Sequence, residues 1–209
     1  MAKSKLKQRL LWWLLFTACL VPLFYNLIQM YWLLNGGAHS LGSEPGKVLV
    51  DHFGKITLYF LWFTLAISPI KKWLGWSKLM KYRRMFGLFV FFYASLHILA
   101  YGTFLLGWTW FLLMEDVVQR PYIFVGLVSW IGLLVLSVTS PKWMIKKLKK
   151  KWVIIHKFIY LIAILAVIHE WMQLRASYFE PLMHAVILAI LLFSRFSFLE
   201  KFKKQPKRR

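Results

Sequence analysis

The pattern of hydrophobic positions divides the chain into apolar stretches of about twenty residues, separated by polar connectors. At about 1.5 Å per residue, a helix of that length crosses the hydrocarbon core of a bilayer. We therefore predict an all-α membrane protein, with residues 1–209 forming a single domain that is a six-transmembrane-helix bundle. The predicted spans are residues 10–34, 51–70, 84–107, 121–140, 152–172 and 180–199.

Prolines and polar residues indicate where these spans begin and end. Asp51 is expected to cap the second span, which closes around Pro69, and Pro121 is expected in the first turn of the fourth. Pro22 lies within the first span and predicts a kink that neighbouring helices accommodate. The aromatic segment 108–120 predicts a short interfacial helix.

The distribution of positive charge predicts the orientation. The chain is 60% hydrophobic and 19% aromatic, yet its net charge is +21, a mixture that excludes a soluble globular domain. Lys and Arg adjoin the ends of the apolar stretches and form no separate patch or arm, so nucleic acid is not expected as a partner. Twenty-two of them lie at the N-terminus, in the connectors 71–84 and 142–151 and in the tail 201–209, against four on the opposite side. Both termini are therefore predicted to be cytoplasmic, with the loops 35–50, 108–120 and 173–179 outside.

Titratable groups within the spans are few. Six of the seven carboxylates lie on or near the predicted outer side, and none occupies the middle of a span, which argues against an ion pump or a proton-coupled carrier.

Cys19 is the only cysteine, so there is neither an intramolecular disulfide nor a C-x-x-C-H motif for covalent heme attachment. His39, His52 and His184 are expected in a loop or at the outer interface.

Histidines within the spans are the candidate metal ligands. His156 and His169 lie thirteen residues apart on the fifth span, near its two ends, and His97 lies fourteen residues beyond Arg83 on the third. An intramembrane imidazole usually faces the bundle interior and a partner. Because His97 and His169 come to similar depths, we predict that they bind one b-type heme iron from facing helices. For a single histidine, the alternative is a hydrogen bond to a backbone carbonyl or hydroxyl within the bundle.

The inner level, which is the part of the bundle near the predicted cytoplasmic face, has one histidine, His156. Arg83 and Arg84 of the third span are predicted at the same depth. Three interpretations remain open. His156 binds a second iron with an unusual partner such as Arg83, it is the single axial ligand of a five-coordinate iron, or it hydrogen-bonds a heme propionate. Both arginines are explained most simply as part of the positive charge that sets the orientation of the chain. A second interpretation is that they bind heme propionates or a flavin phosphate. On an ideal helix, His156 and His169 point in directions about 140° apart around the helix axis. Two hemes in one groove would therefore require that the helix is tilted, that it contains a local bulge, or that the two hemes turn different edges toward it.

Short motifs follow one another along nearly the whole chain, each weak alone but specific in order and spacing. They are Asp51-His52-Phe53-Gly54-Lys55, Tyr82-Arg83-Arg84-Met85-Phe86-Gly87, Ser95-Leu96-His97, Arg120-Pro121-Tyr122, Thr139-Ser140, Lys151-Trp152 with His156 and Tyr160, and Ile168-His169. Together they resemble the MsrQ family, the heme-binding membrane subunits of bacterial periplasmic methionine sulfoxide reductase (MsrPQ) systems. That family lies within the ferric reductase-like transmembrane superfamily, which includes NADPH oxidases.

The resemblance implies a bacterial inner-membrane protein with two bis-histidine hemes b and FMN. Of the four heme-ligand positions, this chain has His97, His156 and His169, with Arg83 at the fourth. The resemblance also implies electron transfer from the quinone pool or a cytoplasmic flavin reductase to a periplasmic molybdopterin-containing subunit that repairs oxidised proteins. The chain itself would then carry no catalytic residue. It lacks a FAD/NAD(P)H domain and a G-x-G-x-x-G motif, so the sequence locates no flavin site.

Two other functions remain open. One is a stand-alone transmembrane ferric or quinone reductase that has no dedicated partner. The other is a non-redox scaffold or carrier whose histidines are structural. The outer loops carry four cations against six carboxylates, which is consistent with a mildly acidic docking face for a periplasmic partner.

Overall fold

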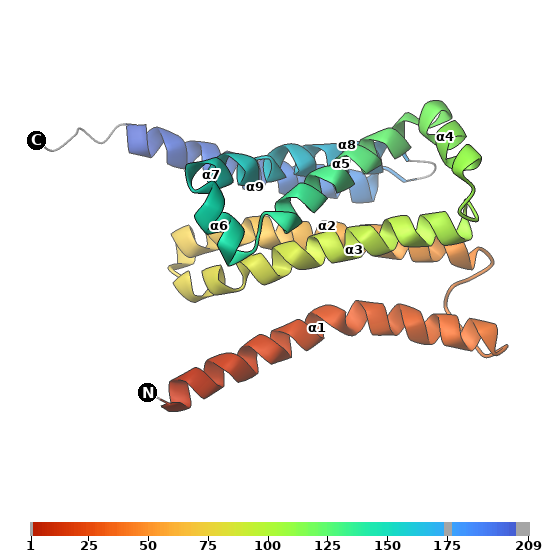
Figure 1. Cartoon of the computed structure of the whole chain (residues 1–209), viewed down its shortest axis with the longest axis horizontal. Coiled ribbons are helices and arrows are strands. Elements are labelled where there is room, and N and C mark those ends of the chain that lie inside the picture. Colours follow the sequence, from red (N-terminus) through yellow and green to blue (C-terminus); the bar gives the residue numbers. More distant parts are fainter. Residues whose placement is uncertain (1, 174–176, 204–209) are drawn as a thin grey trace, which may run out of the picture.

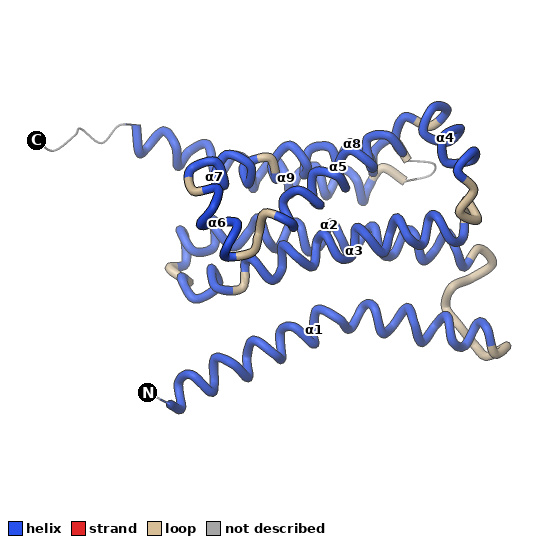
Figure 2. The backbone as a smooth tube through the Cα atoms, in the orientation of Figure 1, coloured by secondary structure: helices blue, strands red, loops and turns tan. Residues whose placement is uncertain are grey.

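The computed structural model describes residues 2–173 and 177–203, with side chains for 6–173 and 177–195. Within these residues every regular element is helical (Figures 1 and 2). The elements are α1 (Ala2–Leu34), α2 (Pro45–Leu74), the 3₁₀ helix η1 (Ser77–Lys81), α3 (Arg83–Phe104), α4 (Trp110–Gln119), α5 (Pro121–Val138), α6 (Lys142–Leu148), α7 (Lys150–Lys157), α8 (Ile159–Met172) and α9 (Phe179–Lys203).

Five helical segments of the described chain are long and apolar enough to cross a membrane, which confirms the predicted all-α, multi-pass class. They are Leu6–Leu34, Pro45–Leu74, Arg83–Phe104, Pro121–Val138 and Lys150–Met172. The sixth predicted span, 180–199, coincides with α9, whose side chains are described only as far as residue 195. The count of six spans and the cytoplasmic termini therefore stay predictions. Residue 175 of the predicted outer loop and residues 204–209 of the basic tail lie outside the described residues.

The ends of α2 differ from the predicted ones. The helix begins at Pro45, whose missing N–H costs nothing in a first turn, so Asp51 lies well inside it and the predicted cap was wrong. The helix also continues through Pro69 and ends at Gly75, which adopts φ 69° and donates its N–H to the Lys71 carbonyl. Both ends extend beyond the apolar stretch because polar residues can continue a helix where it leaves the membrane.

Four helices form the centre of the bundle. α2 and α3 pack along each other, as do α5 and α8, and α3 also contacts α5 (Figure 1). α9 packs on α2 and α8. One buried apolar cluster joins α1 to α2 and α3, and a second joins α2, α3, α5, α8 and α9. The α2–α3 pair belongs to both clusters and therefore connects the two sides of the bundle.

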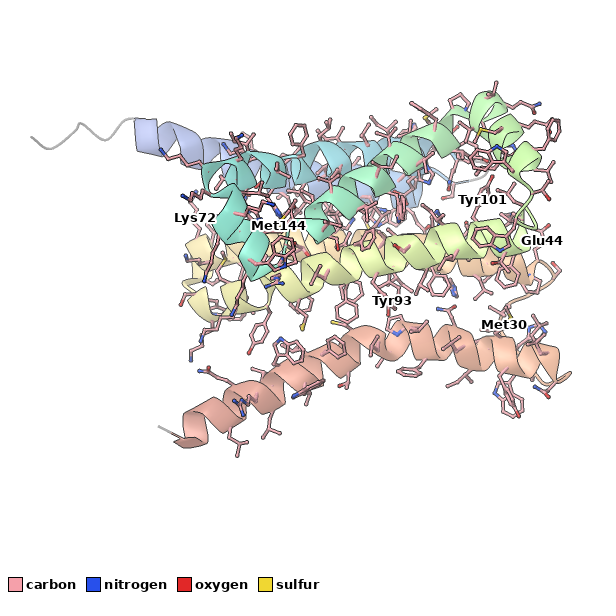
Figure 3. All side chains as sticks on the ribbon, viewed as in Figure 1. Met30, Glu44, Lys72, Tyr93, Tyr101 and Met144 are labelled. Carbon is pink, nitrogen blue, oxygen red and sulfur yellow. The ribbon has the colours of Figure 1, made fainter. Side chains whose placement is uncertain are left out.

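Buried hydrogen bonds hold α1, which bends near its middle, against this pair (Figure 1). Tyr93 of α3 is fully buried, and its hydroxyl donates to the Cys19 carbonyl of α1 at 2.6 Å (Figure 3). Asn26 donates its amide to the Pro22 carbonyl at 2.8 Å, and its side-chain oxygen accepts from His52 Nδ1 at 3.1 Å. These bonds satisfy polar groups at membrane depth, where an unpaired group is costly.

We expect Tyr93→Phe to lower stability by about 1 kcal/mol, because it removes one buried hydrogen bond and conserves the ring. For a chain of this size, that corresponds to a fall of about 2–4 °C in the melting temperature of the purified protein in detergent. Tyr31→Phe is the control, since the Tyr31 side chain is 61% exposed. Equal melting temperatures for the two variants would contradict the role given to the Tyr93 hydroxyl.

Candidate functional site

The structure brings together His97 of α3 and His169 of α8. Their ring centroids lie 6.1 Å apart and their planes are nearly perpendicular, at 88°. Both side chains are partly buried, and each comes from one of the two central helix pairs. At this separation a single metal ion can lie between the two rings, so the arrangement fits a group that takes two axial imidazole ligands.

Each of these imidazoles is held by a backbone carbonyl of the neighbouring helix. His97 Nδ1 lies 2.8 Å from the Val50 carbonyl oxygen of α2, and His169 Nδ1 lies 2.7 Å from the Tyr122 carbonyl oxygen of α5. Because a carbonyl only accepts, Nδ1 carries the proton and Nε2 carries the lone pair. Metal-binding histidines are commonly held in this way by their second ring nitrogen.

A glycine four residues after each accepting carbonyl lets the ring approach. A Cβ on Gly126 would lie 2.7 Å from Cε1 and 2.8 Å from Nδ1 of His169, and one on Gly54 would lie 3.1 Å from Nδ1 of His97. In both pairs the histidine follows its accepting residue by 47 positions. The contacts of these two glycines with the histidines were not predicted from the sequence, although the repeated spacing of carbonyl residue, glycine and histidine was a signal for them.

Gln173 also contacts the site. Its side-chain amide donates to His169 Nε2 at 2.9 Å, in agreement with a lone pair on that nitrogen. The glutamine is exposed and follows the last residue of α8. It can therefore move aside when Nε2 takes another partner. Nothing in its sequence context distinguished this residue beforehand.

His156 lies near the other end of the fifth apolar segment. Its Nε2 is 3.1 Å from the Thr139 hydroxyl oxygen, and Trp152 stacks on its ring at a centroid distance of 4.1 Å. The Thr139 hydroxyl donates to the Val135 carbonyl at 2.7 Å, so its oxygen accepts from His156 Nε2–H. The lone pair of His156 then lies on Nδ1. One ring nitrogen is anchored and the other remains available as a ligand atom.

The segment that carries His156 and His169 is not one regular helix. It is interrupted at Phe158, whose N–H donates to the Ile155 carbonyl three residues earlier, at 3.0 Å. A three-residue bond tightens the local turn relative to an α-helix. The angle of about 140° expected between His156 and His169 on an ideal helix therefore does not apply.

The two arginines predicted near the inner level differ in environment. Arg83, the first residue of α3, is partly buried, whereas Arg84 is exposed. Arg83 lies within electrostatic range of His156, Tyr160 and Arg195. Of the two, Arg83 is therefore placed to contact a group bound between the helices.

His184 was predicted at the outer interface, and its depth in the membrane stays a prediction. Its side chain is only 1% exposed, so the ring faces the interior of the bundle and not its surface. Its Nδ1–H donates to both carboxylate oxygens of Glu170, at 2.9 and 2.8 Å, and its ring packs against Trp62. The buried position is tolerated because Glu170 provides a charged partner. Since Glu170 follows His169 directly, this contact ties α9 to α8 beside the histidine pair.

Polar contacts hold α4 against the C-terminal end of α3 and the start of α5, which is the predicted outer end. Tyr101 of α3 donates its hydroxyl to Asp116 of α4, and Arg120 lies 3.4 Å from the same carboxylate (Figure 3). The Asp116 carboxylate raises the pKa of Arg120 above its ordinary value. These contacts fix the start of α5 next to Tyr122, whose carbonyl holds His169.

Fold and site together define a multi-pass membrane protein whose helices bring two carbonyl-anchored imidazoles close together. Residues 53–167 match the family of ferric reductase like transmembrane components. The chain is 38% identical to the protein-methionine-sulfoxide reductase heme-binding subunit MsrQ of Xanthomonas euvesicatoria over 179 residues, which are 86% of this chain and 82% of that relative. It is 37% identical to the MsrQ of Xanthomonas oryzae over the same shares of the two chains.

The MsrQ of Xanthomonas campestris is 38% identical over 175 residues, which cover 84% of this chain and 80% of the relative. No solved structure matches the chain. The chain therefore belongs to the MsrQ family of heme-binding subunits, within the ferric reductase like transmembrane proteins. The resemblance seen in the sequence motifs is thereby confirmed.

We expect Gly126→Ala to destabilise the protein by about 1–3 kcal/mol, because the added methyl group overlaps the anchored ring of His169. Gly87→Ala is the control. A Cβ at Gly87 meets only a Thr64 methyl group at 3.8 Å, so removing a helical glycine there should stabilise by about 0.5–1 kcal/mol. Opposite shifts in melting temperature are thus expected, and a neutral or stabilising Gly126→Ala would contradict the tight packing on His169.

Proposed function

We propose that this chain holds a heme b between His97 and His169 and passes electrons across the bacterial inner membrane to a periplasmic methionine sulfoxide reductase. The observation that carries this proposal is the pair of carbonyl-anchored imidazoles, with ring centroids 6.1 Å apart. The names of the relatives, which describe heme-binding subunits of such reductases, support it. Heme b, when bound, supplies a one-electron redox centre whose potential depends on its ligands and burial.

The residues around the site have distinct parts in this function. His97 and His169 would each offer Nε2 to the iron, and the carbonyls of Val50 and Tyr122 keep the rings in that tautomer. A hydrogen bond to the second nitrogen also increases the basicity of the ligand. Because the anchors are backbone atoms of packed helices, the two rings hold their orientation when the charge of the bound group changes.

The partners in this proposal follow from the position of the histidine pair near the predicted outer face. We propose a periplasmic molybdopterin-containing reductase subunit as the electron acceptor, and the quinone pool or a cytoplasmic flavin reductase as the donor. The acidic residues of the outer loops provide a surface for the acceptor. We assign no step to FMN, because the sequence contains no glycine-rich phosphate motif.

We expect His97→Ala and His169→Ala each to abolish the bis-imidazole heme spectrum, since either change removes one of the two axial ligands. Absorbance of the purified protein in the Soret and α/β regions checks this, with electron paramagnetic resonance of the ferric state as a second readout. His52→Ala is the control, because His52 bonds Asn26 on the far side of α2. A bis-imidazole spectrum that persists in either ligand variant would refute the assignment.

At the inner level we propose His156 as the only imidazole ligand of any iron bound there. Its anchored Nε2 leaves Nδ1 free to coordinate, and the described part of the chain places no second histidine beside it. Arg83 lies within electrostatic range of His156. We propose that it acts on a group bound there through its positive charge and not as a metal ligand.

His156→Ala is therefore expected to retain the bis-imidazole spectrum of the outer site in full. Heme content per chain, measured on the same sample by the pyridine hemochromogen method, shows whether a second heme depends on His156. The two levels would not be independent if the variant lost the bis-imidazole bands while its melting temperature stayed that of the wild type.

A further inference from the structure

A second cluster of polar side chains lies away from the histidine pair, where three helices from distant parts of the sequence converge. Arg83 begins α3, Tyr160 lies in the first turn of α8, and Arg195 lies on α9. The Cζ atom of Arg195 is 5.5 Å from the centroid of the Tyr160 ring. Arg83 lies within electrostatic range of both residues.

Among the described side chains, no carboxylate forms an ion pair with this cluster. Both arginines are partly buried, and Nη2 of Arg195 is fully buried without a hydrogen-bond partner. Two guanidinium groups repel each other, and a buried charged donor without an acceptor is costly. All carboxylates whose side chains are described belong to segments near the predicted outer side: Glu44, Asp51, Glu115, Asp116, Glu170 and Glu180.

We propose that Arg83 and Arg195 form a binding site for an oxyanion, the carboxylate or phosphate group of a bound amphiphile. A guanidinium group matches both oxyanions with paired donors. Tyr160 packs beneath Arg195 and restricts its orientation. The site goes beyond the outer heme proposed above and does not depend on it.

Two kinds of ligand could provide the oxyanion, a phospholipid or a cofactor. A basic pocket between transmembrane helices on the cytoplasmic side is typical of sites for anionic phospholipids. The helices that carry Tyr160 and Arg195 also expose apolar side chains within two residues of them in sequence, Leu161 at 49% and Phe193 at 75%, as expected for helices that face acyl chains. The second source is a cofactor bound at the level of His156, whose carboxylates would reach Arg83. The same two guanidinium groups would serve either ligand.

The test compares Arg83→Gln, Arg195→Gln and the double variant with Arg84→Gln, all in the full-length protein. Arg84 is a matched control because it is an exposed arginine one position from Arg83. Native mass spectrometry measures retained phospholipid, and heme content is measured on the same samples. Phosphatidylglycerol is then added to delipidated protein, with diacylglycerol as the lipid that lacks phosphate, and the melting temperature is recorded.

For a phospholipid we expect at least a tenfold loss of retained lipid in the double variant, and a thermal shift by phosphatidylglycerol that diacylglycerol does not reproduce. For a cofactor carboxylate we expect reduced heme content in the double variant with lipid retention unchanged. A cooperative thermal transition of the delipidated protein shows that each variant is folded, whether or not heme is bound, and an intact bis-imidazole spectrum shows that the outer heme of the proposed function is unaffected. The proposal is overturned if the double variant matches Arg84→Gln in lipid retention, thermal shift and heme content.

Discussion

The hydrogen bond from an imidazole Nδ1–H to a helix carbonyl is the contact on which the histidine site depends. A helical carbonyl has a second lone pair, so Val50 and Tyr122 can accept from a side chain while they remain in their own helices. In a medium without water the imidazole N–H needs such a partner, and the ring is consequently fixed in one tautomer. The direction of Nε2 is thus set by how α2 packs on α3 and α5 on α8, before any cofactor binds.

The same device occurs twice, with equal spacing of carbonyl, glycine and histidine in both helix pairs. Each pair therefore forms half of the site by itself, and the separation of the rings depends on how the pairs dock. A hydrogen bond between them supports this docking, since the indole N–H of Trp130 on α5 donates to the Ser95 hydroxyl of α3 at 3.1 Å. A bound metal group would bridge the same two halves and stabilise the bundle by linkage.

Much of this was accessible from the sequence, because hydrophobic length and charge position are properties of the chain alone. Counting residues from the predicted cytoplasmic ends of the spans was enough to predict that His97 and His169 lie at similar depths in the membrane. The burial of His184 and the bond between His156 and Thr139 were not accessible, because each depends on a partner that tertiary packing supplies. The cap expected at Asp51 failed for a related reason: hydropathy reports where the apolar stretch begins, not where helical hydrogen bonding begins.

The two ends of the bundle differ in how their charged side chains are paired. At the predicted outer end, carboxylates form ion pairs with cations, as Glu180 of α9 does with Lys55 of α2 at 2.7 Å, and both of these side chains stay exposed. At the other end, an excess of Lys and Arg predicts the cytoplasmic side. Among the residues described there, Arg195 carries a buried Nη2 that has no hydrogen-bond partner. The charge asymmetry that predicts the orientation of the chain thus also leaves a buried guanidinium donor unpaired, and the anion proposed to bind Arg83 and Arg195 would satisfy it.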